Sequence, residues 1–148
     1  MLRLMLSFLL LAIAIPASAA EGLTTLNSRF GVEETQQRLL DALEKGGMQV
    51  AATIDHAHGA EKVGLTLAPT RLVIFGNPRV GTLLMQCQHS IAIDLPMKML
   101  IWEENGSTQV AYNSVNYLNT RHTIAGCDKV LENVAGALDR FARQASGN

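Results

Sequence analysis

Three of the four histidines stand where loops are expected to meet strands and helices. His56 and His58 directly follow an expected strand, and His122 lies between the last expected strand and the last expected helix. Imidazole titrates near neutral pH, so it can move protons or ligate a metal ion, and loops of this kind commonly carry function. The alternative is that Asp55 and Arg121 form a partly buried ion pair while the histidines cap helix or loop ends.

A second pattern of potential ligands is Met85-x-Cys87-x-His89, followed by Met97 and Met99. Soft ligands of this kind suit Cu(I). Residues two positions apart do not share a face of a helix, so one helix cannot present all three side chains to one ion. We therefore expect Met85 and Cys87 to pack in the core.

Asp94, Glu103 and Glu104 are candidates for a pair of carboxylates that act as acid and base. The simpler interpretation places Asp94 in a loop before Leu95-Pro96 and the two glutamates at the edge of a hairpin. No nucleophile elbow, zinc-protease motif, phosphate loop or dinucleotide fingerprint occurs, so no motif names a reaction. Three aromatic side chains could line a pocket, although packing on the sheet is their commoner role: Trp102, Tyr112 and Tyr117.

The two cysteines, Cys87 and Cys127, both fall on the apolar stripes of expected helices. If these helices are neighbours, a disulfide would close a loop of about 40 residues and stabilise the fold by roughly 3–4 kcal/mol. Otherwise the two are separate buried thiols that behave as small hydrophobic residues. Both interpretations stay open, whereas a redox-active pair is not expected without a C-x-x-C arrangement.

Residues 1–20 have the three parts of a secretory signal peptide. Arg3 is the positive start, Leu4 to Ile15 is the apolar run, and Ala17-Ser18-Ala19 offers small residues for cleavage. The run has about 12 residues, fewer than the roughly 20 that a membrane-spanning helix needs. We therefore predict cleavage rather than an uncleaved anchor, a single mature domain over residues 21–148 without a stable membrane span, and a periplasmic or secreted location.

Composition excludes one class of partner. Of the 12 basic residues only Arg3 lies in the signal, which leaves 11 basic and 13 acidic residues without any block of like charge. Nucleic-acid binding draws its affinity from clustered Lys and Arg, so we predict no nucleic-acid partner.

Periodicity predicts strands that alternate with amphipathic helices. Gly46-Gly47 is expected to end the first helix, and Asn105-Gly106 is a strong hairpin signal. Residues 56–63 are expected to form a loop with one helical turn. The fold class predicted from this order is α+β, a two-layer sandwich of a mostly antiparallel sheet with helices packed on it. The expected strands cover residues 23–27, 48–55, 72–75, 97–103 and 108–114, and the expected helices cover 32–45, 80–90 and 123–143.

Ten short blocks, in this order and spacing, resemble the domain of unknown function 302 family over about residues 30–138. The resemblance implies a compact two-layer α+β domain that often pairs into homodimers, and it implies no reaction. The blocks are Ile54-Asp55-His56, Val63-Gly64-Leu65, Pro69-Thr70, Ile74-Phe75-Gly76-Asn77-Pro78, Gly81-Thr82, Leu84-Met85, Asp94-Leu95-Pro96, Trp102-Glu103, Tyr117-Leu118 and Arg121-His122.

Three departures from the family pattern are Leu83 in place of a proline, Thr123 in place of a small residue, and the two cysteines. Asp55-His56 and Arg121-His122 are charged pairs of the family, so the resemblance makes a shared site conceivable. We predict a non-enzymatic periplasmic binding or interaction domain, homodimeric, with its ligand site around Asp55, His56, Arg121 and His122. The alternatives are a small hydrolase-like enzyme that uses these groups and a copper- or haem-binding accessory protein that uses His56 and His122.

Overall fold

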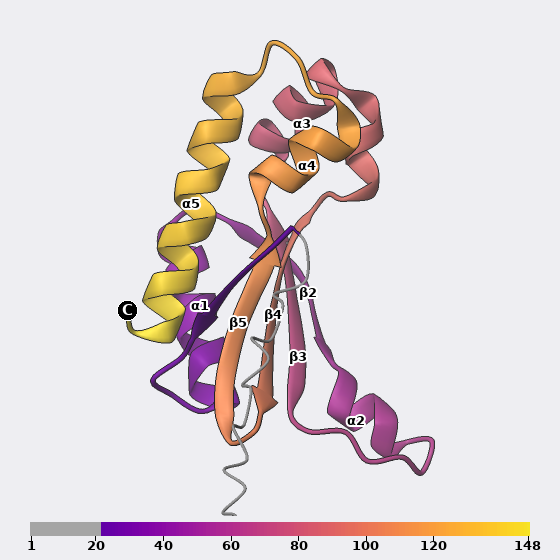
Figure 1. Ribbon diagram of the computed structural model, residues 1–148, viewed down its shortest axis with the longest axis vertical. Coiled ribbons are helices and arrows are strands. Elements are labelled where there is room, and N and C mark those ends of the chain that lie inside the picture. Colours follow the sequence, from indigo (N-terminus) through magenta and orange to yellow (C-terminus); the bar gives the residue numbers. More distant parts are fainter. Residues whose placement is uncertain (1–21) are drawn as a thin grey trace, which may run out of the picture.

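The computed structural model of the protein describes residues 22–148, which form a five-stranded antiparallel sheet with helices packed against it (Figure 1). The strand order is β1-β5-β4-β3-β2, and every neighbouring pair is antiparallel. The predicted α+β class is therefore confirmed, while the predicted signal over residues 1–20 lies outside the described residues. The strands are β1 Leu23–Asn27, β2 Gln49–Asp55, β3 Thr70–Gly76, β4 Met97–Glu104 and β5 Ser107–Asn113.

Two long helices cover one face of the sheet and enclose the core (Figure 1). α1, Val32–Lys45, has the bounds that its apolar stripe predicts, and α5, Asp128–Ser146, packs beside it. The strands turn alternate side chains toward these helices. The ring of Phe75 from β3 meets that of Phe141 from α5 edge to face, with 6.1 Å between the ring centres.

The hairpin between β4 and β5 forms as predicted. Asn105 and Gly106 both have positive φ, 52° and 77°. This left-handed pair is the turn whose twist matches that of the flanking strands, and Asn-Gly tolerates it best. The hairpin therefore aligns Leu100 with Ala111 in the middle of the sheet.

Three short helices form a cap at one end of the sheet: α3 Pro78–Cys87, the 3₁₀ helix η1 His89–Ile93, and α4 Val115–His122. α3 begins where the Asn77 side chain accepts a hydrogen bond from the Arg79 N–H. The single helix predicted over residues 80–90 is wrong at its end, because Gln88 is extended with φ −152° and divides α3 from η1.

α4 was not predicted, and the helix expected over residues 123–143 begins too early. The Ser114 hydroxyl caps α4 by accepting a hydrogen bond from the Tyr117 N–H, at 3.2 Å. Thr123 and Gly126 then take the left-handed conformation, with φ 52° and 77°, which interrupts the helical path. α5 starts only at Asp128.

At the opposite end of the sheet, α2 His56–Glu61 and the loop after it project from the body of the molecule (Figure 1). We call residues 56–69 the arm. Val63, Leu65 and Leu67 on the arm are among the most exposed large apolar side chains of the described residues. No helix within residues 22–148 has both the length and the apolar character needed to cross a membrane.

Candidate functional site

The four residues predicted to share a site are divided between the two ends of the sheet. Asp55 ends β2 and His56 begins α2, whereas Arg121 and His122 end α4 (Figure 1). The structure brings each pair together with new partners, and it does not bring the two pairs together. The separation also places His56 and His122 too far apart in the fold to ligate one copper or haem iron between them.

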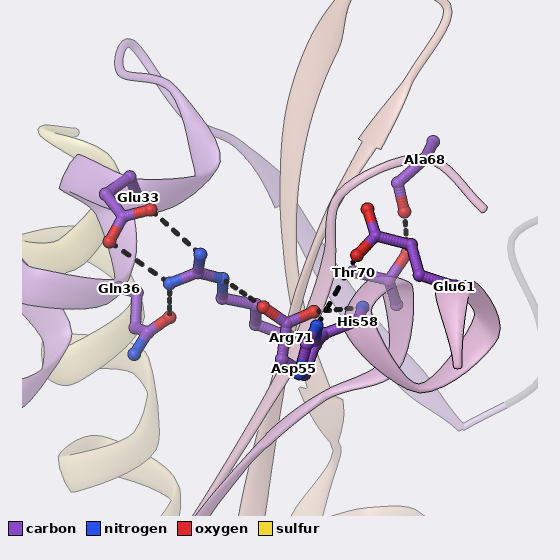
Figure 2. A network of polar contacts seen from close by, with 8 residues as sticks. All are labelled: Glu33, Gln36, Asp55, His58, Glu61, Ala68, Thr70 and Arg71. Atoms are coloured by element: carbon purple, nitrogen blue, oxygen red, sulfur yellow. Dashed lines mark hydrogen bonds and ion pairs between the residues drawn. The ribbon is translucent and has the colours of Figure 1, made fainter. Parts of the chain in front are cut away.

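Asp55 belongs to a network that ties β2 and β3 to α1 (Figure 2). Its carboxylate accepts a hydrogen bond from the His58 N–H at 2.9 Å and lies 3.5 Å from Nε of Arg71. Arg71 also donates to Glu33 and Gln36 of α1, at 2.8 Å each. The backbone hydrogen bond from His58, helped by the Arg71 charge, lowers the pKa of Asp55 below its usual value.

This network is a brace between elements rather than an open site. Asp55 acts as the N-cap of α2, and Arg71 spans the gap to α1. His56 is exposed, and His58 lies beside Glu61 at 3.4 Å. In Figure 2 the Arg71 guanidinium is therefore engaged with Glu33 and Asp55, and the Glu61 carboxylate with His58.

The second cluster is centred on His122, whose side chain is only 5% exposed. Its Nδ1 lies 2.9 Å from the Ser90 hydroxyl, and its Nε2 lies 2.6 Å from Oδ2 of Asp94. Arg121 approaches the same carboxylate oxygen with its Nε at 3.4 Å. Hydrogen bonding to the Tyr117 hydroxyl, together with the Asp94 charge, raises the pKa of Arg121. We call Ser90, Asp94 and His122 the clasp.

The clasp joins η1 and the loop after it to the end of α4. It also has the connectivity of a serine hydroxyl, a base and an orienting carboxylate, the arrangement that activates a nucleophile. Ser90 is exposed while the imidazole is buried, so a reagent in solvent could reach the hydroxyl. Here Nδ1 rather than Nε2 faces the hydroxyl, the reverse of the usual triad.

Sequence reasoning missed this pairing because Asp94 and His122 are far apart in the chain. Glu103 and Glu104, the candidate partners of Asp94, lie exposed at the distant end of β4, next to the hairpin turn, as the simpler interpretation expected. Ser90 carried no motif that could have identified it. Only the packing of η1 against α4 brings the three side chains together.

Both cysteines are paired with each other rather than free as soft-metal ligands. Met99 is fully buried in the core, and the described residues hold no group of three metal-ligating His, Cys, Asp or Glu side chains. The structure places the sulfur atoms of Cys87 and Cys127 at bonding distance, with their Cα atoms 6.3 Å apart. The pair thus joins the end of α3 to the residue that precedes α5.

A large apolar groove lies between the cap and α5. Its volume is about 640 Å³, within the range of small-molecule sites. α3 lines one wall with Val80 and Met85, and α5 lines the other with Ala137 and Phe141. None of the three aromatic residues considered as pocket lining is among the residues of this groove. Tyr112 packs in the core, Trp102 lies on β4, and the Tyr117 hydroxyl accepts a hydrogen bond from Arg121.

The wall formed by the loop after η1 connects the groove to the clasp. Ala92, Leu95 and Pro96 line the groove, while Asp94, between them in sequence, is held by His122. The contact with His122 therefore helps to hold this wall in place.

Residues 24–141 match the family described as "Domain of unknown function DUF302". A crystal structure of an uncharacterized conserved protein DUF302 from Bacillus stearothermophilus superposes with a TM-score of 0.78. The two chains are 19% identical, and the similarity covers 85% of this chain and 99% of the other. At this level of identity the likeness shows the shared fold.

Three bacterial relatives with a named function are longer than this chain. The fluoride-specific ion channel FluC 1 of Brucella suis biovar 1 is 42% identical over 104 residues, which is 70% of this chain and 41% of the relative. FluC 1 of Brucella abortus biovar 1 and FluC 2 of Brucella melitensis biotype 1 match with the same identity over 38% of their length. The matched region thus spans about two fifths of the length of these proteins. The name fluoride-specific ion channel belongs to those longer proteins.

Proposed function

Since the chain belongs to the DUF302 family, whose members are described as domains of unknown function, we propose that it is an exported, non-enzymatic interaction domain that works as a homodimer. The observation that carries this proposal is the apolar character of the sheet face opposite the two long helices. The following paragraphs give its support.

Side chains on this open face alternate with the core residues of the same strands. Leu72 and Ile74 of β3 flank the buried Val73, and Leu100 and Trp102 of β4 flank the buried Ile101. An antiparallel sheet that meets water on one face normally carries polar side chains there. A row of partly exposed leucine, isoleucine and tryptophan across two central strands therefore favours a covering partner.

The arm adds apolar surface that its own chain leaves uncovered. The side chains of Val63, Leu65 and Leu67 are 71%, 65% and 46% exposed. Contiguous exposed apolar surface is typical of interaction sites. A second copy offers both an open face and an arm, so a two-fold dimer would cover these surfaces in both copies at once.

The polar residues support a role without catalysis. The charged side chains of the Asp55 network bind one another, and the ionisable members of the clasp do the same. The large groove is lined by no ionisable side chain. Acid–base chemistry therefore has no ionisable group in the lining of this groove.

Replacing Leu100 by Glu is expected to raise the dimer dissociation constant by about 30-fold or more, the effect of losing one central hot spot. The new carboxylate would have to be buried between the two sheets, where a charge without a partner is costly. Sedimentation velocity over a range of concentrations measures the constant. The side chain is partly exposed in one chain, so the variant is expected to fold.

Ile93→Glu is the matched control, because Ile93 is a 73% exposed apolar residue on η1, away from the open face. Its dissociation constant should stay within about twofold of the parent value. A parent protein that remains monomeric at tens of micromolar, or equal effects of the two substitutions, would refute the homodimer.

Export rests on the signal-like pattern of residues 1–20. Cells that produce the full chain should yield a protein whose mass corresponds to cleavage after Ala19 or beside it. Recovery of the protein in the membrane fraction with Met1 still present would contradict export.

A small serine hydrolase is the second candidate, and the hydrogen bonds of the clasp are the specific observation in its favour. In this function Ser90 would be the nucleophile, His122 the base, Asp94 the orienting carboxylate and Arg121 an anion clamp. Covalent reaction of Ser90 with an organophosphonate would distinguish it from the non-enzymatic domain.

A further inference from the structure

We propose that the groove between α3 and α5 is a binding site for an uncharged, apolar small molecule. This inference is separate from self-association, because the groove lies on the helix side of the sheet and the dimer surface lies on the other. It also differs from the ligand site predicted around Asp55, His56, Arg121 and His122.

The groove is a built feature whose walls come from several parts of the chain. α3 supplies Val80 and Leu84, α5 supplies Leu138 and Phe141, and the start of β2 supplies Val50. Leu84, Leu138 and Phe141 are at most 2% exposed, so the floor consists of core residues rather than mobile surface side chains. The disulfide holds the end of α3 against the start of α5, which fixes the distance between two of the walls.

The chemistry of the lining selects against charge. The lining contains no Asp, Glu, Lys, Arg or His, and its few polar side chains are amides and one hydroxyl: Gln49, Asn77, Thr82 and Asn133. Moving a charged group from water into such surroundings is strongly unfavourable unless a partner compensates it. A neutral molecule with at most one or two hydrogen-bonding groups fits this lining.

Size and position favour a small molecule over a segment of protein. A volume of about 640 Å³ is typical of sites that enclose most of a small ligand's surface. Met48, Met85 and Met97 line the groove, and their flexible thioether side chains adapt to ligands of different shape. The apolar arm projects from the opposite end of the sheet (Figure 1).

The test uses two fluorescent probes that share an anilinonaphthalene body. N-phenyl-1-naphthylamine is neutral, whereas 8-anilinonaphthalene-1-sulfonate carries a negative charge. We expect the neutral probe to bind saturably, one per chain, and at least tenfold more tightly than the sulfonate. Equal or tighter binding of the sulfonate would overturn the assignment, as would the absence of saturable binding.

Paired substitutions locate the bound probe. Ala137→Trp fills the groove from α5 and should weaken binding at least tenfold, while Ala135→Trp, on an exposed position of the same helix outside the lining, should change it less than twofold. Thr82→Trp and Gln86→Trp repeat the comparison on α3, where both positions are exposed and only Thr82 lines the groove. Equal effects within both pairs would place the probe elsewhere and refute the site.

The same titration detects other occupants. A second copy that inserts its arm would make probe binding weaken as protein concentration rises into the dimer range, and Leu65→Ser would restore it. Occupation by residues 1–21 would make the full chain bind less than the processed chain. Either result would reject the small-molecule assignment while leaving the homodimer to its own test.

Discussion

The double variant Cys87→Ala/Cys127→Ala is expected to lose about 4 kcal/mol of unfolding free energy, the chain-entropy value for a loop of this length. The two residues are 40 positions apart, and the bond between them restricts the unfolded chain over more than a quarter of its length. Urea unfolding followed by tryptophan fluorescence and circular dichroism measures the difference.

The position of the disulfide predicts a second, local effect on α3. α3 has only one fully buried residue, Leu84, so its own packing holds it weakly. Without the bond, α3 depends on contacts with η1 and on a few with α5. Removal of the disulfide should therefore also loosen one wall of the groove.

Reduction supplies the control for this prediction. Dithiothreitol should destabilise the parent protein to a similar extent and should leave the double variant unchanged. Two free thiols found by mass spectrometry in the exported protein would show that the bond does not form in its compartment. A loss of less than about 1 kcal/mol would show that the chain-entropy account does not apply here.

Replacing His122 by Leu is expected to cost about 3 kcal/mol, because the Asp94 carboxylate, only 15% exposed, would lose its nearest hydrogen-bond partner, and a buried charged group left without a partner pays a large desolvation penalty. Asp94 would keep only Arg121, which is largely exposed and approaches at 3.4 Å. Leucine can supply neither of the two polar contacts of the imidazole. The measurement is again the free energy of unfolding in urea.

Two neighbouring substitutions calibrate this value. Ser90→Ala should cost less than about 1 kcal/mol, because the hydroxyl is exposed and water can replace it. Arg121→Gln should also cost less than about 1 kcal/mol, since its ion pair lies at the surface. If His122→Leu proves as mild as these two, the clasp does not hold the wall of the groove.

The clasp variants also decide between the two candidate functions. A hydrolase requires an organophosphonate adduct at Ser90 that forms in the parent and disappears in His122→Gln. The non-enzymatic domain requires that Ser90 react no faster than Ser107, an exposed serine at the start of β5. Stability alone would not separate the two, because a structural clasp and a catalytic one both stabilise the fold.

Local patterns were sufficient to predict most of the sheet and one of the two long helices. β1 and α1 have the predicted bounds, and the hairpin turns at Asn105-Gly106 as expected. These features depend on alternation, on helical spacing and on residues that tolerate positive φ, all of which act within a few positions. α4 could have been found from Ser114, an N-cap residue followed by apolar Val115 and Leu118.

The candidate site was predicted less well. Arg121 and His122 were identified, but the carboxylate considered for Arg121 was Asp55, whereas both side chains contact Asp94. The adjacent Arg121 and His122 do not reveal by themselves which distant carboxylate they contact in the folded protein. That choice is made by the cap, where η1 packs against α4.

The sequence by itself therefore determined the type of most elements, the fold class and the residues able to do chemistry, because each depends on short-range spacing. Tertiary structure alone decided which of those residues meet. The disulfide spans 40 positions, the contact of Asp94 with His122 spans 28, and the groove takes lining from Met48 through Phe141. Such contacts arise from how amphipathic faces pack together, and no local pattern records that packing.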